Sequence, residues 1–92
     1  MPCRAIIRIG RGAESDYHIS SSTVSSDHAL LVVGESGQHL LIDHESVNGT
    51  RVAGVDGGER IRQKMVSSNE EVFFGDVRCL VSDILNQIGI RD

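Results

Sequence analysis

The 92-residue chain is poor in aromatic residues and in proline. It has no tryptophan, and its aromatic side chains are those of Tyr17, Phe73 and Phe74. The core must therefore be built mainly from valine, isoleucine and leucine. Pro2 is the single proline, whereas glycine occurs ten times. This balance predicts many tight turns within one small domain.

The chain also lacks an excess of basic charge and any long apolar run. Its formal net charge is -4, which argues against nucleic acid as a partner, because bulk nucleic-acid binding needs a basic footprint. No segment approaches the roughly 20 apolar residues of a membrane span. No signal peptide is visible either. We therefore expect no membrane contact by this segment and a cytoplasmic location.

Cysteine is almost absent, and the two present, Cys3 and Cys79, lie near opposite ends of the chain. They form no CxxC pair, so zinc or redox chemistry is not expected. Each falls on a predicted strand, and these two strands could be neighbours, which leaves a disulfide open. The favoured interpretation is a pair of reduced, apolar thiols in a cytosolic protein.

Short apolar segments separated by turn residues recur along most of the chain. The segments that favour strands are residues 3–9, 17–19, 29–33, 38–42, 50–53, 61–66, 71–74 and 77–81. Many short strands with turns between them predict an all-β fold, a two-sheet sandwich of mostly antiparallel strands.

The last residues differ from the rest. Residues 83–92 read as a C-terminal tail beyond a strand-rich domain of residues 1–82. Ser82 or Asp83 is suited to cap one or two helical turns, with Ile84, Leu85 and Ile88 on one face. The same residues could equally begin a linker.

Small polar residues stand between the strands in the first half of the chain. Arg11 follows Gly10 at a strand end, and a guanidinium can hold two phosphate oxygens at once. Ser25 can donate to a phosphate oxygen, whereas His28, just before an apolar run, is placed to fix loops by hydrogen bonds. Asn48, in a turn with the next glycine, can hold the main chain of a peptide. These residues predict a phosphate site on a sandwich edge.

Three other chemistries are disfavoured by spacing, so no enzyme, cofactor or metal is expected. Gly10 and Gly12 follow a strand, but Ser15 stands where a dinucleotide-binding loop needs glycine, and no helix follows. Ser25, His28 and Asp43 lack a nucleophile elbow. The histidines match no usual set of metal ligands; they are His18, His28, His39 and His44.

The ordered set of motifs resembles the forkhead-associated (FHA) domain. The motifs are Ile9-Gly10-Arg11, Val24 to Ala29, and Leu41 to Val52 with its Ser46-Val47-Asn48-Gly49-Thr50 core. Val72 to Gly75 resembles the family's apolar-then-glycine strand, and the resemblance covers residues 4 to 81.

The resemblance implies a β-sandwich whose binding loops lie at one end and recognise phosphothreonine. The phosphate-binding roles then fall on Arg11, Ser25 and Ser26, and the role of holding the peptide backbone falls on Asn48. The loop-shaping positions of the family are matched by Gly10, His28, Gly49 and Thr50. The partner implied is a threonine-phosphorylated protein in a serine/threonine kinase pathway, with this domain as a non-catalytic adaptor.

Three residues depart from the family pattern. Ser26 is neutral and Asp27 is acidic where a basic residue is common, and Val47 lacks a hydroxyl that can contact phosphate. We therefore expect micromolar binding, about -8 kcal/mol, with preference set by the loop Ser20 to Thr23. The alternative is a degenerate family member that acts as a phosphate-independent structural or interaction scaffold.

Overall fold

The computed structural model describes residues 4–54 and 58–90, and these residues form eight strands and one helix. The elements are β1 (Ala5–Gly10), β2 (Tyr17–His18), β3 (Ala29–Val33), β4 (Gln38–Asp43), β5 (Thr50–Val52), β6 (Gln63–Ser67), β7 (Glu71–Phe74), β8 (Val77–Leu80) and α1 (Val81–Ile88).

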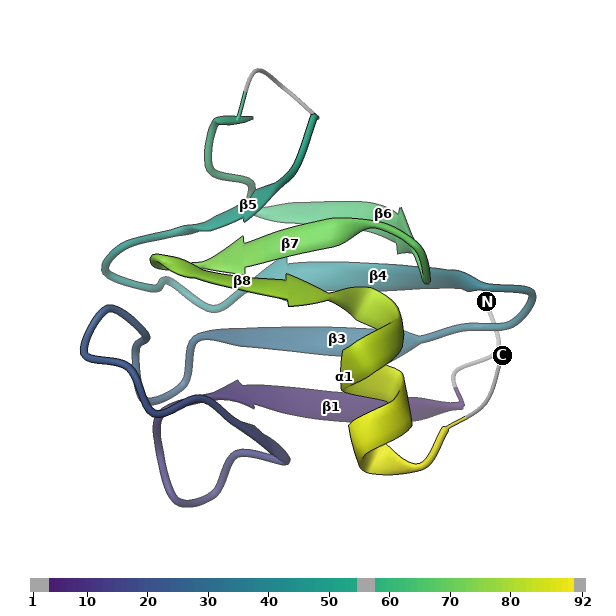
Figure 1. Ribbon diagram of the computed structural model, residues 1–92, viewed down its shortest axis with the longest axis horizontal. Helices are drawn as coiled ribbons and strands as arrows, with labels where there is room; N and C mark the ends of the chain where they lie inside the picture. The colour runs from purple at the N-terminus through teal and green to yellow at the C-terminus, as the bar shows by residue number, and fades with distance from the viewer. Residues whose placement is uncertain (1–3, 55–57, 91–92) are drawn as a thin grey trace.

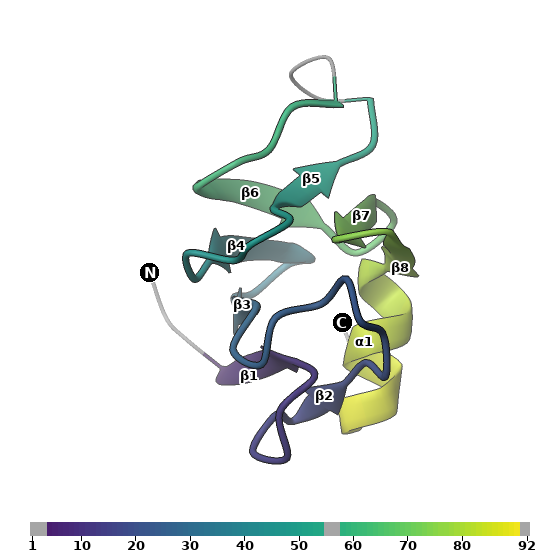
Figure 2. The ribbon, with the colours of Figure 1, turned by 90° about the vertical axis from the view of Figure 1, so that its left-hand side faces the viewer.

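The strands form two sheets, as predicted for a sandwich (Figure 1). The larger sheet has the order β2-β1-β3-β4-β6 and the smaller one β5-β7-β8. All pairs are antiparallel except β1 with β2. In Figure 2, β5, β7, β8 and α1 lie together on one side of the larger sheet. The prediction of an all-β sandwich is therefore confirmed.

The core lies between the sheets and follows the two-residue alternation of strands. Ile7 and Ile9 of β1 are buried, and so are Leu31 and Leu41 of the neighbouring strands, whereas Arg8 points outward. Most of the buried apolar side chains in the described residues are valine, isoleucine or leucine, as the scarcity of aromatics predicts.

Several strand ends differ from the prediction. The segment predicted from Ile61 pairs only from Gln63, because the Ile61 nitrogen donates to the Thr50 oxygen of the other sheet at 2.8 Å. Ile61 is buried, so its hydrophobicity reflects the core and not strand pairing. Val81, predicted to end the last strand, instead begins the helix.

The residues Val81–Ile88 form a packed helix, α1. Its N-cap is Leu80, with no side-chain cap, so the prediction that Ser82 or Asp83 caps it is wrong. Gly89, at φ 89°, ends the helix, and its nitrogen donates to the Asn86 oxygen. Ile84 is fully buried, because the apolar face covers the larger sheet beside β8.

The two strands predicted to carry Cys3 and Cys79 are not neighbours. β1 belongs to the larger sheet and β8 to the smaller one. Cys79, on β8, is a free and buried thiol. Cys3 lies outside the described residues. Within those residues, no helix is long and apolar enough to span a bilayer.

Candidate functional site

Three loops and one tight turn meet at one end of the sandwich, which faces the viewer in Figure 2. The loops are residues 11–16, 19–28 and 44–49, and the turn is residues 75–76. Backbone hydrogen bonds join them: the Arg11 nitrogen donates to the Ser25 oxygen at 3.0 Å, and the Gly75 nitrogen to the Gly49 oxygen at 3.0 Å. The end is thus a connected rim and not a set of independent loops.

Gly10 sets how closely the first two loops approach. A Cβ atom built at this position would lie 2.1 Å from the Ser26 carbonyl oxygen and 3.0 Å from that of Ser25. Any side chain here would push away the loop of residues 19–28, which we call the serine loop. Glycine at the strand end therefore brings Ser25 and Ser26 next to Arg11.

His28 joins the serine loop to the loop of residues 44–49, which we call the asparagine loop. It is fully buried, and its Nδ1 accepts a hydrogen bond from the Ser25 nitrogen at 3.0 Å. That bond makes Nε2 the protonated nitrogen, which donates to the Gly49 oxygen at 2.9 Å. The ring also meets Phe74 edge-on, with centroids 5.6 Å apart. The imidazole bonds the Ser25 backbone and not its hydroxyl, so it does not activate that hydroxyl as a nucleophile.

Asp43 organises the asparagine loop from the end of β4. One carboxylate oxygen accepts hydrogen bonds from the Thr50 hydroxyl at 2.7 Å and the Ser46 hydroxyl at 2.5 Å. The Ser46 hydroxyl oxygen in turn accepts from the Gly49 nitrogen at 3.0 Å. Gly49 has φ 88°, a left-handed conformation that glycine adopts without strain. Thr50 is fully buried within this network.

Arg60, which lies outside the asparagine loop in sequence, also contacts it. It donates to the Ser46 carbonyl at 2.7 Å and pairs with Asp43 at 3.8 Å, and its side chain lies over Gly49. Sequence reasoning assigned no role to Arg60 or Ser46. An aspartate at a strand end followed three residues later by serine is a local turn signal for Ser46. No local signal points to Arg60.

Arg11 faces the centre of the rim. Its Nε donates to the Val24 oxygen at 3.0 Å, which fixes the plane of the guanidinium. Among the described residues, nothing takes a hydrogen bond from its terminal amino groups. An arginine oriented through Nε presents those two amino groups as a fork for an anion.

Ser25 and Asn48 are positioned beside Arg11 by bonds within the rim. The Ser25 hydroxyl oxygen accepts from the Val47 nitrogen at 3.0 Å, which leaves its hydrogen to donate elsewhere. Asn48 Nδ2 donates to the Thr23 oxygen at 2.8 Å. The Thr23 hydroxyl also accepts from the Asp76 nitrogen at 3.1 Å, so Thr23 links the turn to the loops. Nothing in the local sequence distinguishes Thr23 from the serines beside it.

The four residues predicted to bind ligand lie on one hollow of about 310 Å³. Its lining consists of Arg11, Ser22, Thr23, Val24, Ser25, Ser26, Val47 and Asn48. Arg11 is its single charged side chain, and Val47 is its most exposed apolar one, at 81 %. The four predicted loop-shaping residues do not line it; Gly10, His28, Gly49 and Thr50 lie behind it and are buried.

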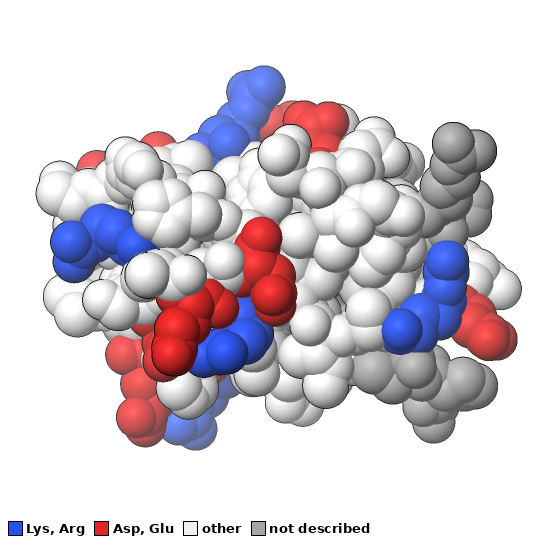
Figure 3. Space-filling model, turned by 90° about the horizontal axis from the view of Figure 1, so that it is seen from below, with Lys and Arg blue, Asp and Glu red and all other residues white. Residues whose placement is uncertain are grey.

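Two acidic side chains near the rim, Glu14 and Asp27, pair with an arginine that does not line the hollow. Asp27 forms an ion pair with Arg8 at 4.0 Å, and Glu14 with the same arginine at 3.5 Å. Figure 3 shows a cluster in which acidic and basic side chains mix, with smaller charged groups elsewhere and uncharged surface between them. Asp27 does not line the hollow, so its charge opposes an anion there only from a distance.

The sequence matches the FHA domain family over residues 7–75. The chain belongs to the FHA domain family. A comparison with curated proteins finds no match. FHA domains are recognition modules known for binding phosphopeptides in signalling, and they are generally non-catalytic.

Solved structures place this FHA domain among others of the same fold. The FHA domain of the CT664 protein from Chlamydia trachomatis has a TM-score of 0.74 and 26 % identity, covering 87 % of this chain and 78 % of that one. EmbR from Mycobacterium tuberculosis, in complex with a low-affinity phosphopeptide, has a TM-score of 0.67 and 29 % identity, covering 80 % and 18 %. A structure from work on phosphothreonine-dependent FHA domain interactions has a TM-score of 0.71 and 21 % identity, covering 83 % and 74 %.

The titratable groups with shifted pKa values lie away from the rim of this FHA domain. Burial raises the pKa of Tyr17 on β2, and Cys79 and Asp83 add to the rise. Burial also raises the pKa of the Cys79 thiol, against a smaller lowering by its hydrogen bond with Tyr17. This pair joins β2 to β8, so it contributes to stability and not to the chemistry of the hollow.

Proposed function

We propose that this FHA domain binds phosphothreonine peptides at the hollow between its loops. The observation that carries the proposal is the meeting of Arg11, Ser25 and Asn48, from three different loops, on one hollow with a single positive charge. A phosphate carries about -1.5 to -2 charges and three strong acceptor oxygens. The hollow offers a cation and several donors to match it.

The phosphate is held by Arg11, Ser25 and Ser26. The two free amino groups of Arg11 take two phosphate oxygens, since Nε is already bonded to Val24. The Ser25 hydroxyl, fixed by the Val47 nitrogen, donates to a further oxygen. Ser26 is exposed on the same wall and supplies a second hydroxyl. With one cation in the lining, affinity depends mainly on Arg11, and binding is micromolar, about -8 kcal/mol.

The peptide backbone beside the phosphate is held by Asn48. One hydrogen of its Nδ2 is used by the Thr23 oxygen, so the amide plane is fixed in the bound orientation. The second hydrogen and the amide oxygen then address the main chain of an extended ligand. Val47 stands next to Asn48 with 81 % of its surface exposed, and it offers an apolar contact to the ligand.

The biological role that follows is that of an adaptor. A serine/threonine kinase writes the mark on a partner protein, and the domain binds the marked protein in the cytoplasm. The similarity to EmbR bound to a phosphopeptide supports the phosphopeptide binding on which this role depends. Phosphorylation acts as the switch, because the unmodified threonine lacks the charge that Arg11 recognises.

A second candidate is a phosphate-independent scaffold. The observation that favours it is Val47, an exposed apolar side chain where a hydroxyl can help to hold phosphate. In that case the rim binds a partner through apolar contact, and Arg11 is dispensable.

Oriented peptide libraries separate the two candidates. Matched phosphothreonine, phosphoserine and unmodified libraries are passed over the protein and over its Arg11→Ala variant. If the domain is a phosphothreonine-binding module, only the wild type selects phosphothreonine peptides. If the domain is a phosphate-independent scaffold, both proteins bind modified and unmodified peptides equally.

A further inference from the structure

Two neighbouring carbonyl groups of the serine loop orient the two longest polar side chains of the hollow. Arg11 Nε donates to the Val24 oxygen at 3.0 Å, and Asn48 Nδ2 donates to the Thr23 oxygen at 2.8 Å. Arg11 and Asn48 come from two other loops, so the segment 23–24 sets how they stand relative to each other. The place of this short segment therefore determines the geometry of the hollow.

The Thr23 hydroxyl attaches this segment to the turn of residues 75–76. Its oxygen accepts a hydrogen bond from the Asp76 nitrogen at 3.1 Å. It also lies 2.9 Å from the Ser21 hydroxyl oxygen, with which it shares a hydrogen. The turn joins β7 to β8 in the smaller sheet and does not line the hollow. The turn therefore acts on the hollow from outside, through Thr23.

Gly75 allows this turn to lie against Thr23. A Cβ atom built on Gly75 would lie 2.3 Å from the Thr23 carbonyl oxygen and 2.8 Å from its hydroxyl oxygen. The Gly75 nitrogen also donates to the Gly49 oxygen at 3.0 Å. The turn thus contacts both the carbonyl that orients Asn48 and the loop that carries Asn48.

Residues 21–24 form one compact turn. The Val24 nitrogen donates to the Ser21 carbonyl oxygen at 3.1 Å, and the Thr23 nitrogen donates to the Ser21 hydroxyl oxygen at 3.3 Å. These bonds give the turn its shape but do not place it against the rest of the rim. Outward, the turn is attached by the buried Val24 side chain and by the bond between the Thr23 hydroxyl and the Asp76 nitrogen.

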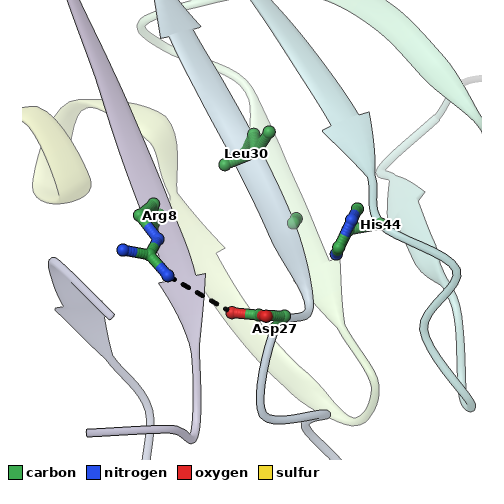
Figure 4. Close-up of a pocket in the computed structure, with 5 residues that line it drawn as sticks. Arg8, Asp27, Leu30 and His44 are labelled. Atoms are coloured by element: carbon green, nitrogen blue, oxygen red, sulfur yellow. Dashed lines mark ion pairs between the residues drawn. The ribbon is translucent and has the colours of Figure 1, made fainter. Parts of the chain in front are cut away.

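The far end of the serine loop does not replace this attachment. There Asp27 pairs with Arg8 of β1 at 4.0 Å, the contact marked in Figure 4. Both side chains are exposed, so the pair contributes little to stability. Neither residue lines the hollow. The orientation of the Thr23 carbonyl therefore depends on its own hydroxyl.

We propose that Thr23 is the positioning residue of this hollow. Through its hydroxyl, the turn of residues 75–76 sets the directions of Asn48 and Arg11. The hydroxyl already has two partners within the protein, so it acts on a ligand through Asn48 and Arg11 and not by contact. For peptide affinity the inference rests on the proposed function, whereas for the orientation of the two side chains it does not.

NMR of the protein without ligand tests the orientation. The wild type is compared with Thr23→Val, which replaces the hydroxyl by a methyl group, and with Thr23→Ser, which keeps the hydroxyl. The measured quantities are the water-exchange rates of the Asn48 side-chain amide and of the Arg11 Nε hydrogen. In Thr23→Val both should exchange at least about fivefold faster, which corresponds to about 1 kcal/mol, the scale of one hydrogen bond. In Thr23→Ser both should stay within about twofold of the wild type.

Ser67→Ala is the control for a general loss of stability. The Ser67 hydroxyl also has two partners, Asn69 at 2.8 Å and Glu70 at 3.1 Å, but it lies at the opposite end of the larger sheet. This variant should leave exchange at the Asn48 side chain unchanged. Thermal unfolding confirms that each variant folds.

Gly75→Ala disturbs the same attachment from the other side, and Gly37→Ala is its matched control. Both glycines have positive φ, 59° and 73°, so alanine strains the backbone at each position. At Gly75 the new Cβ meets Thr23, whereas at Gly37 the nearest atom lies 3.9 Å away. We expect both variants to lose stability, and Gly75→Ala alone to speed exchange at the Asn48 side chain. If Gly75→Ala does not fold, the two Thr23 variants decide.

Affinity for a phosphothreonine peptide is then measured on the same proteins. Thr23→Val should bind at least about fivefold more weakly than the wild type, and Thr23→Ser within about twofold of it. Adding Thr23→Val to Asn48→Ala should cost less affinity than adding it to the wild type, because Thr23 acts in part through Asn48.

Three results overturn the proposal. They are unchanged exchange at Asn48 and Arg11 in Thr23→Val, equal effects of Thr23→Val and Thr23→Ser, and equal effects of Gly75→Ala and Gly37→Ala on the Asn48 side chain. A wild type that binds no phosphothreonine peptide overturns the proposed function instead, and the exchange rates of the free protein still decide the role of Thr23.

Discussion

The imidazole of His28 donates a hydrogen bond to the carbonyl oxygen of Gly49 at 2.9 Å, joining two loops that lie 21 residues apart. Its other nitrogen accepts from the Ser25 nitrogen at 3.0 Å. One buried side chain thus sets the spacing between the serine that faces the hollow and the turn that carries Asn48. The shape of the candidate site is therefore coupled to the stability of the fold.

Removing this connection should destabilise the protein strongly. His28→Ala leaves a cavity beside Phe74, leaves the Ser25 nitrogen without its partner and removes one of the two hydrogen bonds to the Gly49 oxygen, so we expect a loss of about 2–5 kcal/mol. Urea unfolding gives the free energy directly. His44→Ala, at an exposed histidine in the next loop, is the control and should change stability by less than about 0.5 kcal/mol. Equal effects of the two substitutions would contradict the role given to His28.

Gly10 should not tolerate even a methyl group. In Gly10→Ala the new Cβ meets the Ser26 oxygen at 2.1 Å, and the serine loop must move. We expect a loss of about 1–3 kcal/mol, as in other overpacked sites. Amide chemical shifts of residues 25 and 26 should change most. Gly12→Ala, where the same distance is 3.0 Å, should have a smaller effect on both measurements. The reverse order would show that the loops are not held by this contact.

Asp43 should matter more than other aspartates near the rim. Its side chain is only 7 % exposed, and its carboxylate accepts bonds from Ser46 and Thr50 while pairing with Arg60. Asp43→Asn removes the charge from these bonds, and we expect a loss of about 1.5–3 kcal/mol by chemical denaturation. The matched change Asp76→Asn, at an exposed position, should have little effect. A loss as small as that of the control would rule out the network around Asp43.

Stability should fall at alkaline pH. Burial raises the pKa of Tyr17 and of Cys79 above their unfolded values of 10.0 and 9.0. The folded state therefore holds protons that the unfolded state has released, and stability declines once pH rises above about 9. Urea unfolding from about pH 8 to about pH 11 measures the decline. Tyr17→Phe should reduce it, because the phenylalanine cannot ionise. An equal decline in that variant would exclude Tyr17 as a source.

The sequence predicts most of the fold because the physics of each strand is local. Continuous apolar runs such as Ala29–Val33, and the glycine turns between such segments, mark the strands without tertiary information. Ile61 and Val81 were assigned to strands because both are apolar, but one is buried outside any pairing and the other begins α1. The apolar character of a residue predicts that it is buried, but it does not show whether the residue pairs in a strand or begins a helix.

The candidate site also contains both residues that the sequence predicts and residues that it does not. Arg11, Ser25, Ser26 and Asn48 were predicted from motifs and do line one hollow. Arg60 is not predicted, and Thr23 is predicted only as a member of the loop Ser20 to Thr23. Each acts on a residue distant in sequence: Arg60 on Ser46, and Thr23 on Asn48. Such contacts depend on how the loops pack, which no local pattern specifies.

Titration of one phosphothreonine peptide selected from the library tests the central claim most directly. Calorimetry is done with wild type, Arg11→Ala and Arg8→Ala, a matched arginine that is exposed but pairs with Glu14 away from the hollow. The account predicts micromolar binding by wild type and Arg8→Ala, and a loss of about 1.5–3 kcal/mol, roughly 10- to 150-fold, in Arg11→Ala. Unchanged affinity in Arg11→Ala, or equal affinity for the unmodified peptide, would contradict it.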